Sequence, residues 1–150
     1  MTPANMWKRF RGLKKLIIEV NKMKNDINHV TKILDTVSRG YIQAVYFTDT
    51  GEADQPDSDA DVDERFNFIV LSDCAEFLNY CQHNGLLDEY AALPSATWDS
   101  FGIDFWLTRN GHGAGFWDRG YGELGGKLTD AAKNFGGRDT FNDYGLLSFD

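Results

Sequence analysis

The chain has 150 residues, the length of one domain, and its 42% hydrophobic and 14% aromatic content argues against a disordered chain. No run of about 18 apolar residues is present, so we expect no membrane-spanning segment. The net charge of −8 is uneven, because residues 1–40 hold nine Lys/Arg against three Asp/Glu (+6) and residues 41–150 hold six against twenty (−14).

Apolar residues over positions 6–38 recur at alternating gaps of three and four, which predicts one long helix with a heptad seam. The seam residues are Leu13, Leu16, Val20, Met23, Ile27, Val30, Leu34 and Val37. With Leu13 at position a, Glu19 falls at g and Lys24 at e, an attractive pair in a parallel dimer. Further isoleucines widen the stripe, as in a helix that packs on its own domain. We therefore expect a basic amphipathic helix over residues 1–40, ending at Gly40, that forms a homodimer or packs on the body.

The remaining residues, 41–150, are expected to form an acidic α+β domain. Residues 41–48 are rich in β-branched and aromatic side chains and predict a strand. Residues 49–63 form a polar loop. Asp63 then serves as the N-cap of a helix with apolar residues at helical spacing, which Gly85 ends.

The second half of this body predicts shorter elements. Residues 86–92 and 95–101 predict helical segments on either side of Pro94. Aromatic runs on both sides of Asn110-Gly111 predict a β-hairpin, because both turn residues tolerate positive φ. A helix then continues to Phe135, and two short strands follow around Asn142-Asp143. The fold expected is a small antiparallel sheet packed with helices.

The two cysteines, Cys74 and Cys81, fall within the predicted second helix. Their separation of two helical turns is roughly 10 Å, which is too far for a disulfide. We therefore expect buried, reduced thiols.

The polar loop carries a run of carboxylates that we take as a candidate partner-binding surface. Its residues are Asp54, Asp57, Asp59, Asp61, Asp63 and Glu64. The loop does not match an EF-hand, because Val62 holds the glycine position and Phe68 the position of the closing glutamate, so calcium binding is a minor alternative. The loop is either a solvated segment with a helix cap, or a surface that occupies a basic groove which normally binds nucleic acid.

The glycine-rich segment 111–115 is a second candidate site. It lacks the third glycine of a dinucleotide-binding loop and the Gly-Lys-Ser/Thr of a P-loop. A ligand here would meet Arg109, Asn110, Gly111, His112, Gly113 and Arg119. An acid/base set, or a metal triad, could consist of His112 with Asp104 and Asp118. The main expectation is nevertheless no catalytic residues, no metal and no cofactor.

One stretch, residues 104–120 (DFWLTRNGHGAGFWDRG), resembles a segment of small uncharacterised proteins of tailed bacteriophages. The similarity continues through residues 123–129, and the upstream layout with Asp73-Cys74 is also similar. The resemblance covers about residues 40–138, whereas the basic helix departs from it. It implies a phage or prophage product that acts in the host bacterial cytoplasm, and it implies no site residues.

Together these features predict a phage-encoded binding protein rather than an enzyme. It would inhibit a host nucleic-acid-handling defence system, of the anti-CRISPR or anti-restriction type, by acidic surface occupancy. Its partner would be a host protein with a basic nucleic-acid-binding surface. The alternatives are a small-nucleotide binder or enzyme that uses the segment around His112, and a structural protein that assembles through the heptad helix.

Overall fold

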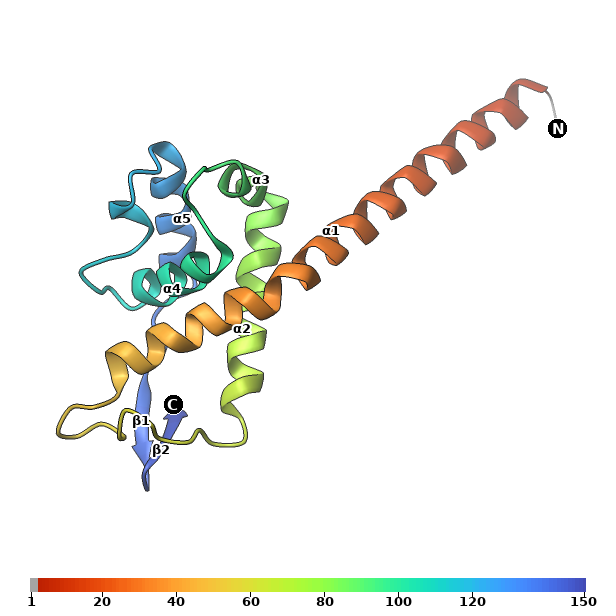
Figure 1. Ribbon diagram of the computed structural model, residues 1–150. Helices are drawn as coiled ribbons and strands as arrows, with labels where there is room; N and C mark the ends of the chain where they lie inside the picture. Colours follow the sequence, from red (N-terminus) through yellow and green to blue (C-terminus); the bar gives the residue numbers. More distant parts are fainter. Residues whose placement is uncertain (1–2) are drawn as a thin grey trace. The chain divides into compact units, whose positions relative to one another are not determined.

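The computed structural model describes the backbone of residues 3–150 and the side chains of residues 11–150. The elements are α1 (Pro3–Asp49), α2 (Phe66–His83), α3 (Leu86–Ala91), α4 (Trp98–Arg109), the 3-10 helix η1 (Phe116–Asp118), α5 (Glu123–Asn134), β1 (Thr140–Asp143) and β2 (Leu146–Phe149). Helices predominate, and one two-stranded antiparallel sheet follows them, so the α+β prediction is confirmed (Figure 1). In the part of the chain described, no helix is long and apolar enough to span a membrane.

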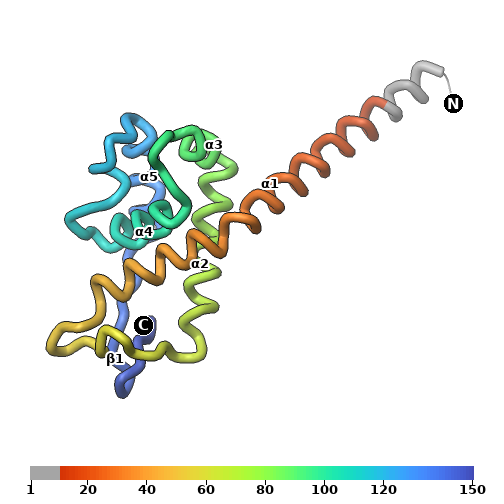
Figure 2. Tube along the Cα trace, viewed as in Figure 1, coloured from red at the N-terminus to blue at the C-terminus, as the bar shows by residue number. Residues whose placement is uncertain are grey.

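The chain separates into two compact units, Met1–Lys32 and Ile33–Asp150, whose boundary lies within α1. This helix passes Gly40 without a break and ends at Asp49 (Figure 2). The predicted helix end at Gly40 and the predicted strand over residues 41–48 are therefore wrong. Tyr41, Ala44 and Val45 are buried and continue the helical stripe of Val37. Burial of that stripe outweighs the β-propensity of the individual residues, which depends strongly on context.

Gly40 does not end a helix but allows two helices to approach closely. A Cβ atom added at Gly40 would lie 2.1 Å from the carbonyl oxygen of Asp99, near the start of α4. Likewise, a Cβ atom added at Gly102 of α4 would lie 1.9 Å from the carbonyl oxygen of Val37 in α1. Both glycines are thus required because backbone occupies the space of a side chain.

The core of the larger unit is largely aromatic and is centred on Phe77 of α2. The Phe77 ring stacks on Phe105 of α4 with centroids 4.0 Å apart, and it also meets Phe101 and Phe116. Phe105 in turn lies 5.5 Å from the ring of Tyr41 in α1. The core therefore joins α1, α2 and α4 and the segment that follows them.

The segment predicted as a β-hairpin around Asn110-Gly111 is instead helix α4 followed by a loop and η1. Asn110 is the C-cap of α4, with φ of −98°, and Gly111 has φ of +69°. The Gly111 N–H donates to Thr108 O, and the His112 N–H donates to Leu107 O, which together form a Schellman motif. An Asn-Gly pair suits a helix C-terminus as well as a hairpin turn, so the predicted hairpin is wrong although the predicted positive φ at Gly111 is present.

The true hairpin lies at the C-terminal end of the described chain. Residues 144 and 145 form its turn, with φ of +49° at Tyr144 and +95° at Gly145. Asp143 pairs with Leu146 across this turn, so the two predicted strands are confirmed but their turn is two residues later than Asn142-Asp143. The helix predicted to end before Gly136 is α5.

The N-cap predicted for α2 differs from the observed one, and α4 begins at a side-chain cap. Asp63 lies before α2 rather than at its N-cap, and its carboxylate accepts the N–H of Arg65. Thr97 caps α4 by accepting the N–H of Ser100 at 3.2 Å. The short helix predicted after Gly85 is α3.

We expect Gly102→Ala to lower the free energy of unfolding by about 1–3 kcal/mol, because the methyl group would force α1 and α4 apart. Gly126→Ala is the matched control, since Gly126 lies within α5 with no neighbour near its Cβ direction. This control should raise stability by about 0.5–1 kcal/mol. Urea denaturation of both variants checks the prediction. Equal stability of the two variants would contradict the close approach.

Candidate functional site

The acidic loop between α1 and α2 has a well-defined backbone. Within it, Gly51 N–H donates to Pro56 O, and Ala60 N–H donates to Asp57 O, each at 2.9 Å. The loop is also joined to β2, because Leu147 N–H donates to Asp61 O at 2.9 Å. From α1, the Tyr46 hydroxyl donates to Ala60 O at 2.6 Å. The loop therefore presents its side chains from a fixed framework.

The carboxylates of this loop face solvent with one exception. Asp54, Asp57, Asp59, Asp61 and Glu64 are exposed, and Asp63 is half-buried. Among the ion pairs of the described side chains, none involves these six residues. The turn over residues 57–60 breaks the regular sequence spacing, so the loop does not present one extended row of charges. The six sequence-predicted residues thus lie on one ordered loop.

The arginines of the body are directed to other partners. Arg109 and Arg138 both bind Asp73, and Arg119 binds Asp104. Arg65 donates to the carbonyl oxygen of Phe149. Two lysines complete the cations of residues 41–150, Lys127 and Lys133, both on α5 and exposed. In the part of the chain that the structure describes, no arginine therefore forms an ion pair with a carboxylate of the acidic loop.

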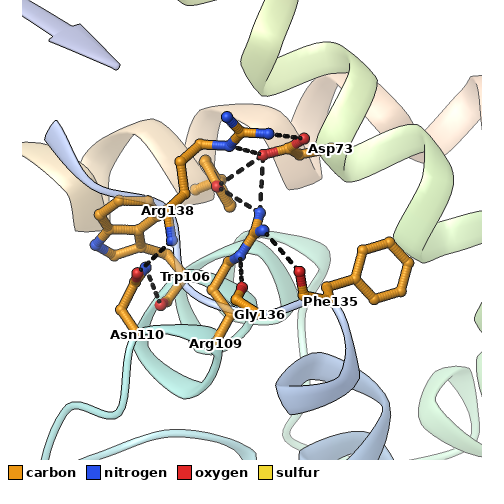
Figure 3. Close-up of polar contacts among 8 residues, drawn as sticks. Asp73, Trp106, Arg109, Asn110, Phe135, Gly136 and Arg138 are labelled. Carbon is orange, nitrogen blue, oxygen red and sulfur yellow. Dashed lines mark hydrogen bonds and ion pairs between the residues drawn. The ribbon is translucent and has the colours of Figure 1, made fainter. Parts of the chain in front are cut away.

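A buried carboxylate, Asp73, stands at the centre of a polar network (Figure 3). Its Oδ2 atom lies 2.8 Å from Nη1 of Arg109, and its Oδ1 atom lies 2.9 Å from Nη2 of Arg138. The Tyr41 hydroxyl accepts from Arg109 at 3.2 Å and is 3.5 Å from Asp73. Burial is the main cause that raises the pKa of Tyr41. One carboxylate thus pairs with two guanidinium groups, and four segments of the chain meet there.

Both arginines also make contacts besides those with Asp73. Arg109 Nε donates to Gly136 O at 2.8 Å, just after α5, and its guanidinium lies over the Phe105 ring. Arg138 lies over the Phe149 ring, and the hydrogen bond with Asp73 raises the pKa of this guanidinium. The arrangement is that of a structural junction, because every one of these contacts is internal.

Asn110 extends the junction along the chain. Its Nδ2 donates to Trp106 O at 3.0 Å, and its Oδ1 accepts the N–H of Arg138 at 2.8 Å (Figure 3). Trp106 Nε1 then donates to Thr48 Oγ1 at 2.9 Å, near the end of α1. Two of the residues proposed as an alternative ligand site, Arg109 and Asn110, therefore hold the fold together.

The other proposed residues of the glycine-rich segment fall into two separate places. Asp104 is fully buried against Arg119 at 2.8 Å and lines a hollow of about 290 Å³, and burial raises the pKa of its carboxyl. His112 instead lines a hollow of about 240 Å³ with Asp49 and Arg138. Asp118 accepts the N–H of Gly115 at 3.0 Å. The structure therefore does not group His112 with Asp104 in one hollow.

Backbone N–H groups of this segment are also engaged internally. His112 N–H and Gly111 N–H cap α4, and Phe116 N–H donates to Thr108 Oγ1 at 3.1 Å. A phosphate-binding loop needs such groups to point at its ligand, so this geometry gives no support to nucleotide binding. Among the side chains that the structure describes, no three His, Cys, Asp or Glu residues are grouped to hold a metal ion.

Comparisons with protein-family models, curated proteins and solved structures found no match to this chain. The assignment of a site therefore depends on geometry. Sequence reasoning missed Asp73 as the central residue, although an aspartate beside the apolar residues Val70, Cys74 and Phe77 of one helix was a usable signal. Arg138 gave no comparable signal, since it follows two glycines in an irregular segment.

We expect Asp73→Asn to lower the free energy of unfolding by about 3–5 kcal/mol, because two guanidinium groups would lose their only shared carboxylate. Asp35→Asn is the matched control, since Asp35 pairs with Arg39 on the exposed surface of α1. That change should have little effect on stability, because an exposed ion pair is screened by solvent. Chemical denaturation measures both, and similar small losses would show that the junction is not a stabilising centre.

The thiols of α2 should be protected in the native protein. Both cysteines are free, and burial raises the pKa of Cys74 and of Cys81 to about 12. Because the thiolate is the reactive form, an alkylating reagent at pH 8 should modify neither residue until denaturant is added. Ser58→Cys is the control, since Ser58 is exposed in the acidic loop and its thiol should react at once. Rapid modification of Cys74 or Cys81 in native protein would contradict their burial.

Proposed function

We propose that this protein is a binding protein whose acidic loop occupies a basic, nucleic-acid-binding surface of another protein. The observation that carries the proposal is the set of exposed loop carboxylates without ion pairs, on a backbone fixed to α1 and β2. The ion pairs of Arg109, Arg119 and Arg138 are with Asp73, Asp104 and Asp118 and not with carboxylates of the loop.

Two physical arguments support such a role. Lys and Arg in a nucleic-acid groove attract any polyanion, and carboxylates on a protein can take the place of phosphates there. A loop that is already ordered loses less conformational entropy on binding than a flexible one. Occupancy requires no chemical step, which agrees with the internal engagement of Arg109, Asn110 and Asp104.

The biological setting is part of the same proposal. The similarity of residues 104–120 to segments of tailed-phage proteins supports a phage product that acts in the bacterial cytoplasm. The partner would then be a host complex that binds nucleic acid for defence, of the CRISPR or restriction type. Inhibition would follow from competition, since the acidic loop and the nucleic acid would bind the same groove.

The test is a pull-down from bacterial lysate with the immobilised full chain, with and without competing double-stranded DNA. Wild-type protein should capture nucleic-acid-binding proteins that DNA displaces and that rising salt releases. The loop variant Asp54→Asn, Asp57→Asn, Asp59→Asn, Asp61→Asn should lose this capture.

A second variant with the same change in charge provides the control. It carries Glu76→Gln, Asp88→Asn, Glu89→Gln and Asp130→Asn, which are exposed on α2, α3 and α5. It should capture the same proteins as wild type if the loop is the binding surface. Capture that survives in the loop variant, or that is lost equally in both variants, would refute a role for this loop.

A further inference from the structure

A row of apolar side chains on the N-terminal part of α1 is exposed, within the unit Met1–Lys32. Leu13, Leu16, Val20, Met23 and Ile27 have exposed fractions of 41–63%. They occupy successive a and d positions of the heptad pattern. An apolar stripe of this length on a soluble surface is a sign of a binding partner.

The same heptad frame continues without interruption into the larger unit. There Val37 and Ala44 hold d positions and Tyr41 holds an a position, and all three are buried. One helix thus carries one seam, which is buried at Val37, Tyr41 and Ala44 and exposed from Leu13 to Ile27. Because residues 33–49 already hold α1 in helical form within a folded core, the N-terminal part needs no costly nucleation to remain helical.

We infer that residues 13–27 form a parallel, two-stranded coiled coil with a second copy of this chain. The residue types at the seam favour two strands, because the β-branched residues Val20 and Ile27 lie at a and Leu16 lies at d. Lysines and asparagines at positions b, c and f would remain in solvent. Ile18, at position f, is exposed and would not be covered by this dimer.

The charges beside the seam select the parallel arrangement. In a parallel pair, Glu19 at g of one chain meets Lys24 at e of the other, and symmetry makes this contact twice. In an antiparallel pair, g positions meet g positions, so Glu19 and Asp26 would face like charges. This inference does not depend on the proposed role of the acidic loop, since it concerns the other unit.

Light scattering of the full chain tests the association. Wild type at micromolar concentration should have twice the 17.0 kDa mass of one chain. Val20→Asp with Ile27→Asp should raise the dimer Kd by at least about a hundredfold, because the seam would bury unpaired carboxylates. The control, Asn21→Asp with Asn25→Asp, adds the same charge at positions b and f and should remain dimeric.

Two further variants test the orientation. Leu13→Cys should form an intermolecular disulfide on mild oxidation, because only a parallel pair brings position 13 next to itself. Glu19→Lys should weaken the dimer, and Glu19→Lys with Lys24→Glu should restore it. A monomer mass at all concentrations would overturn the inference, and so would a monomer that binds anionic lipid vesicles through this face. A Leu13→Cys chain that crosslinks only when Ile27→Cys is also present would refute the parallel arrangement.

Discussion

The carboxylate of Asp73, buried between two guanidinium groups, is the interaction on which the larger unit depends. Through it, Tyr41 of α1, Arg109 of α4 and Arg138 before β1 are joined to α2. Burial of an ion pair is costly unless further hydrogen bonds satisfy the charged groups. Here Arg109 also donates to the backbone after α5, so the chain must fold back to this point before these hydrogen bonds can form.

This interior junction also determines what the molecule presents outside. The two arginines at Asp73 and the one at Asp104 form their ion pairs with these buried carboxylates, within a body whose net charge is −14. The acidic loop lies at one end of the same framework, held by Tyr46 and Leu147. The arginines are thus paired with the carboxylates of the interior, and the carboxylates of the acidic loop are left without ion pairs.

Much of the fold could be predicted from periodicity, but contacts distant in sequence could not. The heptad pattern, the apolar spacing of α2 and the glycines after α5 identified those helices. The strand predicted over residues 41–48 failed because its β-prone residues bury one helical stripe. Asn110-Gly111 failed because a helix cap and a hairpin turn favour the same residues. The acidic loop was visible in the sequence, whereas the partners of Asp73 lie 36 and 65 residues away and no local pattern connects them.

The claim that Asp73 organises this unit is tested most directly by a double-mutant cycle with Arg109. The unfolding free energies of Asp73→Asn, Arg109→Gln and the double variant give the coupling between the two side chains. We expect a coupling of about 2–3 kcal/mol, as for groups within one buried network. Additive effects, within about 0.5 kcal/mol, would contradict the account, because they would mean that the two charges do not depend on each other.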